Sequence, residues 1–103
     1  MQKVYCIKKL WISNEGGDIP IPEFETEVFK SAKSRDKAWN RLVLDHNNMI
    51  QDAYEIDLND SSYEEDYYYD WNNDMLIFYD KAEPTCHYDF FEKCEEVVID
   101  EEE

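Results

Sequence analysis

Residues 34–53, SRDKAWNRLVLDHNNMIQDA, contain the clearest structural pattern in this chain of 103 residues. Side chains that can line one helix face recur at spacings of three and four: Trp39, Leu42, Val43, His46, Ile50 and Ala53. This stripe predicts an amphipathic helix over residues 35–53, packed across a sheet and capped by the Ser34 hydroxyl. Polar residues fall mainly on the remaining surface: Arg35, Arg41, Asp45, Asn48 and Asp52.

Two segments before this helix have the two-residue alternation of strands. Residues 4–12 (VYCIKKLWI) are rich in β-branched and aromatic side chains, and their even positions share one face: Val4, Cys6, Leu10 and Ile12. Residues 24–30 alternate again, and we expect them to pair with the first strand. Between the two strands, residues 13–18 form a turn cluster, and Pro20 and Pro22 favour an extended loop.

The segments after the helix are less regular. Residues 54–58 (YEIDL) alternate and predict a short strand. Residues 67–71 (YYYDW) and 75–79 (MLIFY) flank a three-residue polar connection, which predicts a hairpin. Residues 88–99 fit a final helix, with Phe91, Cys94 and Val98 on one face, or a final strand, and the pattern leaves both open.

Together these segments predict a small α+β domain over residues 1–99. We expect a mostly antiparallel sheet of about four strands with the one main helix on one face. Leu, Ile, Val and Phe make up 23 of 103 residues, which is near the level of disordered chains, but eight Tyr and three Trp favour a folded core. Residues 100–103 (DEEE) are expected to form a frayed acidic tail.

The charge of the chain is large and uneven. There are 26 acids against ten Lys and Arg, for a formal net charge of −16. Residues 1–50 hold eight basic and seven acidic side chains, whereas residues 51–103 hold two and 19, together with 11 of the 16 aromatics. Because phosphates and anionic lipids repel such a surface, the composition argues against direct binding to nucleic acid or membranes.

The sequence also indicates where the protein resides. It contains no run approaching the 18 or so apolar residues of a membrane-spanning helix, and three lysines interrupt the apolar residues of its start. An odd number of cysteines, Cys6, Cys86 and Cys94, favours reduced thiols over a disulfide framework. We therefore expect a cytoplasmic protein.

Motifs for catalysis or cofactor binding are absent from the sequence. Cys86, His87 and Cys94 supply at most three ligands, one short of a structural zinc site. Residues 57–61 begin like a calcium-binding EF-hand loop, but Ser62 and Tyr68 stand where glycine and glutamate are required. We expect no enzymatic activity, no cofactor and no metal, with His46 in the core.

The strongest functional signal is the acidic and aromatic segment 61–74. Charges on a sheet edge would prevent aggregation, but the excess of negative charge is well above the 2–8 or so that solubility requires of a small domain. Carboxylates around aromatic anchors would suit a basic partner. The candidate partner-binding residues are Tyr63, Glu64, Glu65, Asp66, Tyr67, Tyr69, Asp70, Trp71 and Asp74.

This segment resembles a known family. Residues 63–67 (YEEDY), leading to Asn73-Asp74-Met75 and an apolar strand, are similar to the acidic segment of type II anti-CRISPR proteins, small phage-type DNA-mimic inhibitors of Cas9. The resemblance implies that the acids contact arginines and lysines where Cas9, with its guide RNA, reads duplex DNA. It also implies that Tyr67, Tyr69 and Trp71 pack beside them, and that the protein acts in the host cell of a phage or mobile element.

Three other interpretations stay open at this point. The protein could be an acidic interaction protein, such as an antitoxin, an adaptor or an inhibitor of a restriction enzyme or DNA glycosylase, that binds a basic partner. A metal-assisted enzyme built on Cys86, His87 and nearby acids is a second alternative. The acidic segment could also be disordered until it is bound.

Overall fold

The computed structural model describes residues 2–13, 21–84 and 87–98. The predicted tail at 100–103, Cys86 and most of the predicted loop at 13–22 lie outside these ranges. The described elements are β1 (Gln2–Ser13), β2 (Pro22–Phe29), α1 (Ala32–Ala53), the short 3₁₀ helix η1 (Ser61–Glu65), β3 (Tyr67–Trp71), β4 (Met75–Asp80) and β5 (His87–Val98).

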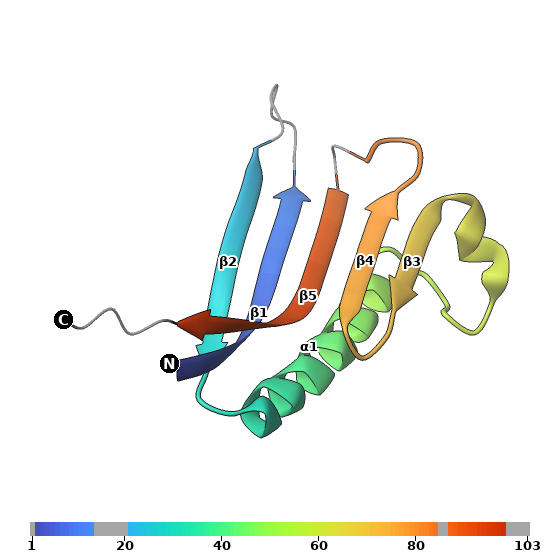
Figure 1. The fold of residues 1–103 in the computed structure, drawn as a ribbon. Helices are drawn as coiled ribbons and strands as arrows, with labels where there is room; N and C mark the ends of the chain where they lie inside the picture. The colour runs from blue at the N-terminus through green and yellow to red at the C-terminus, as the bar shows by residue number, and fades with distance from the viewer. Residues whose placement is uncertain (1, 14–20, 85–86, 99–103) are drawn as a thin grey trace.

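All five described strands form one antiparallel sheet, in the order β2-β1-β5-β4-β3 (Figure 1). The α+β class is therefore confirmed, with one strand more than the four or so expected. The hairpin of β3 and β4 is confirmed, and so is the pairing of β1 with β2. Strand β5 lies between β1 and β4, so the last segment is a strand and not the alternative helix. The two edges of the sheet are β2 and β3.

Helix α1 begins three residues earlier than predicted. Ser31, not Ser34, is its N-cap: the Ser34 backbone N–H donates to Ser31 Oγ over 3.1 Å. The backbone of Ser31 is still extended, because β2 ends only two residues before it, and the helix starts directly from the strand. Ser34 lies inside the first turn, so the predicted cap at Ser34 was wrong.

Residues 54–58 do not form the predicted strand. The Tyr54 N–H closes the last turn of α1 on the Ile50 carbonyl, and Glu55 adopts a left-handed backbone with φ of 55°. That conformation turns the chain at once, as residues after helix ends commonly do. Ile56 is 7% exposed and belongs to the core, so the apolar alternation reflects anchoring of a turn rather than a strand.

The hydrophobic core lies between α1 and the face of the sheet that the helix covers. Trp39 and Ile50 of the helix pack with strand residues, and the Trp39 Nε1–H donates to the Asn72 carbonyl in the β3–β4 turn over 3.1 Å. His46 is buried, as predicted, whereas Ala53 is exposed. The buried members of the core are Ile7, Trp39, Ile50, Ile56, Tyr69, Leu76, Phe78 and Phe91.

Arg35 was expected on the solvent side of α1 but is buried. Its guanidinium donates to the Cys94 carbonyl over 2.9 Å and lies 5.3 Å from the centre of the Tyr5 ring. Cation–π attraction and the hydrogen bond compensate the loss of water around the charge. Helix periodicity alone could not reveal this, because the partner of Arg35 is a backbone carbonyl of β5, 59 residues further along the chain.

The other face of the sheet, called the open face below, carries the alternate residues of each strand. It includes Val4, Cys6, Leu10 and Ile12, which share one face as predicted. Cys6 and Cys94 are direct neighbours across β1 and β5, and both are free thiols. Among the described residues, no helix is both long and apolar enough to span a membrane.

Candidate partner-binding surface

Ion pairs fasten β1 to the strands on both sides of it. Lys8 Nζ lies 2.7 Å from a carboxylate oxygen of Glu96 on β5, and Lys9 Nζ lies 2.7 Å from Glu27 on β2. The hydrogen bond and charge of Glu96 raise the pKa of Lys8. The bases of the first half of the chain thus compensate acids on both neighbouring strands.

A second group of ion pairs surrounds the start of α1. Asp36 receives Lys93 Nζ at 3.0 Å and the Arg35 guanidinium at 3.1 Å. The hydrogen bond from Lys93 holds the pKa of Asp36 below its ordinary value. Further along the helix, Arg41 pairs with Asp45 one turn away. The acids of this half of the molecule are therefore largely partnered.

Residues 55–83 present the opposite situation. They hold ten acids and a single base, Lys81, for a net charge of −9. Lys81 Nζ donates to the backbone carbonyl of Glu64, so it neutralises no side chain. Within the part of the chain that the structure describes, no ion pair involves the exposed acids that we call the acidic edge: Glu55, Asp57, Asp60, Glu64, Glu65, Asp66, Asp70 and Asp74.

The acidic edge lies along one border of the sheet. Strand β3 pairs with β4 alone, so its other side has no strand neighbour in the described sheet (Figure 1). Before it come the α1–η1 connection and η1, and Asp74 lies in the turn after it. Asp60 caps η1 by accepting from the Ser62 N–H over 3.0 Å. Charge on an edge strand also opposes aggregation, and the two roles are compatible.

All five acids of the predicted partner-binding set, Glu64, Glu65, Asp66, Asp70 and Asp74, are exposed on the acidic edge. The aromatic members of the set divide differently, because alternate residues of β3 point to opposite faces. Tyr67, Tyr69 and Trp71 share the face that α1 covers, and Tyr63 packs against the same core. Tyr69 is 9% exposed, and Tyr63 and Tyr67 are half-buried. Trp71, at 37%, is therefore the only exposed side chain of these four.

Burial and hydrogen bonding fix Tyr69 in the core. Its hydroxyl lies 2.9 Å from His46 Nδ1 and donates to the side-chain carbonyl of Asn47. Burial raises the pKa of Tyr63, Tyr67 and Tyr69. Tyr68, which the predicted set omitted, is 40% exposed on the open face beside Asp70. The alternation of β3 could have identified it, since Tyr68 and Asp70 have the same parity.

A buried polar network links α1 to the sheet. Asp89 of β5 accepts hydrogen bonds from His46 Nε2 at 2.8 Å and from His87 Nε2 at 3.0 Å. His87 Nδ1 in turn lies 2.5 Å from the Tyr54 hydroxyl. Burial alone would raise the pKa of Asp89, but the hydrogen bonds from the two histidines outweigh it and keep that pKa below its ordinary value.

Donors and acceptors in this network can be balanced completely. With an ionised Asp89, both histidines donate through Nε2, and the Tyr54 hydroxyl is hydrogen-bonded to His87 Nδ1. His46 Nδ1 and the Asn47 side chain complete the network at the Tyr69 hydroxyl. Each of these polar groups has a hydrogen-bond partner within the network, so the network stabilises the fold.

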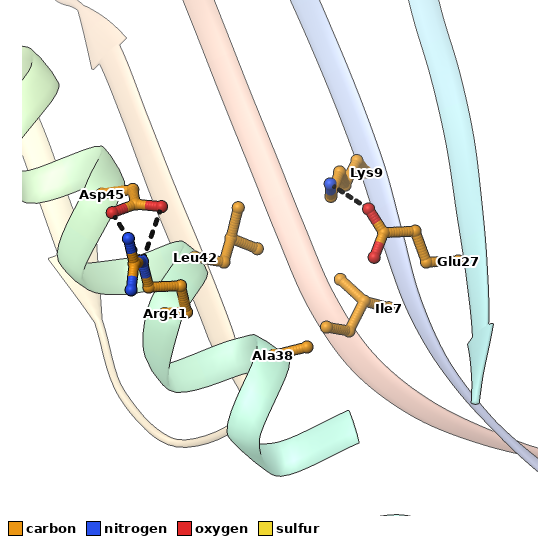
Figure 2. A pocket seen from close by; sticks show the side chains of 7 residues that line it. All are labelled: Ile7, Lys9, Glu27, Ala38, Arg41, Leu42 and Asp45. Carbon is orange, nitrogen blue, oxygen red and sulfur yellow. Dashed lines mark hydrogen bonds and ion pairs between the residues drawn. The ribbon is translucent and has the colours of Figure 1, made fainter. Parts of the chain in front are cut away.

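The described residues contain no cluster of three or more side chains arranged to hold a metal ion. A groove of about 220 Å³ lies between α1 and β1, with Ile7, Ala38 and Leu42 as its apolar lining (Figure 2). Its charged groups are already paired, Lys9 with Glu27 and Arg41 with Asp45. The groove therefore offers no free charge for binding a small polar ligand.

No protein-family model, no curated protein and no solved structure matches this chain. The acidic edge, with Trp71 and Tyr68 on either side of β3, is the candidate surface that its own geometry and charge distribution single out.

Proposed function

We propose that the protein is an acidic DNA-mimic inhibitor, whose acidic edge occupies the basic cleft of a nucleic-acid-binding protein. One observation carries the proposal: most of the acids around β1, β5 and α1 have basic partners, whereas the eight exposed acids of the acidic edge have none within the described chain. Concentrated like charge destabilises the compact state, and a basic partner would relieve it.

The arrangement of β3 suits a cleft that normally holds nucleic acid. Asp70 lies on the same side of β3 as Tyr68, and Asp66 caps the end of η1 directly before the strand. Further carboxylates come from η1 before β3 and from Asp74 after it. A basic cleft shaped for phosphates would attract this charge from a distance and raise the association rate by a factor of about 10 to 10³.

Cas9 with its guide RNA is the first partner that we propose. This choice rests on the resemblance of residues 63–75 to type II anti-CRISPR proteins. The corresponding site on Cas9 is built from arginines that read the short motif next to the target sequence in duplex DNA. A protein that fills this site prevents target recognition without cutting or modifying anything, so the mechanism requires no catalytic residue.

Competition with DNA tests the proposal. Binding of the protein to an immobilised Cas9–guide complex is measured before and after loading with duplex DNA that carries the motif, and a duplex lacking the motif is the control. We expect the loaded complex to bind at least about tenfold more weakly and the control to have no effect, with affinity falling steeply as salt rises. Equal affinity for the free and the loaded complex would contradict occupation of this site.

If Cas9 does not bind, a pulldown from host lysate with and without added duplex DNA extends the test to other nucleic-acid-binding proteins. A basic partner that DNA displaces supports mimicry with a different target. A partner that is retained equally with and without DNA contradicts mimicry, and favours an interaction protein such as an antitoxin or adaptor.

A further inference from the structure

The open face of the sheet carries a contiguous apolar patch. Three tyrosines stack across neighbouring strands, with ring centres 5.2 Å apart for Tyr68 and Tyr79 and 5.7 Å apart for Tyr79 and Tyr88. In the adjacent row, apolar residues are in register from β2 to β4. The apolar patch consists of Pro22, Ile12, Tyr88, Tyr79, Tyr68, Phe24, Leu10, Phe90 and Ile77.

Such a face is unusual for a sheet that is covered on one side only. When one face of an antiparallel sheet packs on a helix, the other normally alternates to polar residues. Here Phe24 is 74% exposed and Tyr68 is 40% exposed. Apolar faces of this extent mark surfaces that another layer covers. Within the described chain, α1 covers the opposite face, so no element of the chain supplies that layer.

We propose that a second copy of this chain covers the patch, so that two sheets pack face to face in a symmetric dimer. An isologous contact needs only one self-complementary surface, and an apolar patch of stacked rings satisfies that requirement. The patch itself contains no charged side chain. On the open face, Lys8 and Glu92 form the charged row next to the patch, Glu96 lies beyond them, and Asp70 lies at the β3 border.

The charge distribution selects how the two copies are arranged. A two-fold axis parallel to the strands places β3 of one copy opposite β2 of the other, so that the two acidic edges are about 19 Å apart across the sheet. An axis across the strands would stack β3 on β3 about 10 Å apart. Because the screening length at physiological salt is about 8 Å, only the first arrangement avoids strong repulsion between two segments of −9.

The size of the face approaches what a stable contact requires. Five strands of about eight residues span about 24 by 26 Å, or roughly 600 Å². A standard interface buries about 800 Å² per partner, which side chains at the margins would complete. The face is also hollowed between Phe24 and Phe90, with a volume of about 300 Å³, and this space can receive a side chain from the facing sheet.

The test is the molar mass of the full chain in solution, measured by light scattering and sedimentation up to about 300 μM. We expect twice the 12.5 kDa of one chain, with a dimer fraction that increases with salt because screening reduces repulsion between copies. The double variant Phe24→Thr, Tyr68→Thr should be monomeric. Leu44→Gln is the control, since Leu44 is 54% exposed on α1, away from the patch.

The arrangement is tested in the same samples. In a dimer mixed from isotope-labelled and unlabelled chains, we expect contacts between chains from the Phe24 ring to Tyr68, because β2 faces β3 of the partner copy. A monomer at all concentrations and salts, a dimer that the double variant leaves intact, or contacts from β2 to β2 would overturn the proposal.

The contacts between labelled and unlabelled wild-type chains test the dimer even if the double variant fails to fold. This dimer does not depend on the proposed inhibition, and salt affects the two in opposite directions. Raising the salt concentration strengthens the apolar contact, whereas it weakens binding through the acidic edge.

Discussion

The acids of β5 and the acids of the acidic edge lie in the same sheet but have different surroundings. On β5, Asp89 accepts from two histidines and Glu96 pairs with Lys8, so their charge helps to hold the strands and α1 together. At the β3 edge, Asp66 before the strand and Asp70 within it are exposed and form no ion pair in the described residues. In this sheet, charge that contributes to the fold is partnered within the chain, and the acidic edge, which concentrates unpartnered acids, is the surface that we propose binds another molecule.

The largest expected contrast is in stability. Asp89→Ala leaves the buried His46 and the partly buried His87 without their acceptor and should reduce the free energy of unfolding by about 3 kcal/mol. Asp70→Ala, its counterpart on the acidic edge, should change it by no more than about 0.5 kcal/mol. Urea denaturation of both variants measures the difference, and Asp89→Asn serves if the alanine variant does not fold. Similar losses at the two positions would remove the distinction between the two regions.

Acid titration should separate the two regions as well. The folded-state pKa of Asp89 is lowered from its ordinary value of 3.8, so its contribution to stability is present above that pH and is lost as pH falls through the folded value. We expect the wild type to lose stability below about pH 3.8. Urea midpoints across this range should fall less steeply for Asp89→Asn, and parallel curves would show that Asp89 does not control acid unfolding.

A smaller effect is expected at Glu55, which belongs to the acidic edge and ends α1. Its left-handed backbone disfavours any residue with a side chain, and its negative charge opposes the helix dipole. Glu55→Gly removes both disadvantages and should increase the free energy of unfolding by about 1 kcal/mol, as measured by thermal denaturation. Glu55→Gln isolates the charge and should recover only part of this gain. A destabilised glycine variant would mean that the Glu55 side chain makes a necessary contact.

Salt should produce the smallest effect. If unpartnered acids repel one another, raising NaCl from about 20 mM to about 0.5 M should increase Tm by a few degrees. The same experiment on Asp66→Asn, Asp70→Asn should show a reduced increase. A decrease in Tm with salt would instead mean that the ion pairs around β1 outweigh repulsion along β3.

Local patterns predicted most of the fold. The α1 stripe, the two-residue alternation of β1 and β2 and the polar turn at 72–74 are short-range signals, and each corresponds to an element. The last segment was ambiguous because His87–Val98 has apolar residues at both helical and strand spacings, and only its place between β1 and β4 decides the matter. The strand predicted at residues 54–58 was wrong, because a turn whose Ile56 side chain packs in the core shows the same apolar alternation as a strand.

The candidate site was predicted only in part, because sequence shows which residues are acidic but not which acids are partnered. Lys8 neutralises the charge of Glu96 only because β1 and β5 are neighbours in the sheet, although the two residues are almost ninety positions apart in the chain. Tyr68 is exposed and Tyr69 is buried because they lie on opposite faces of β3 and α1 covers only the face of Tyr69. Sequence alone does not show which face of the strand the helix covers. The apolar patch on the open face likewise emerges only when five strands are aligned.

The most direct test of the central claim compares two pairs of charge reversals with the same change in net charge. Asp66→Lys, Asp70→Lys alters the acidic edge, whereas Glu23→Lys, Asp52→Lys alters exposed acids elsewhere that have no ion pair in the described residues. Affinity for the Cas9–guide complex, or for a basic partner captured from lysate, is then measured for both. The first pair should weaken binding by a factor of about 10 to 10³ and the second by less than about threefold. Equal losses for the two pairs would show that only net charge matters and would contradict a specific acidic edge.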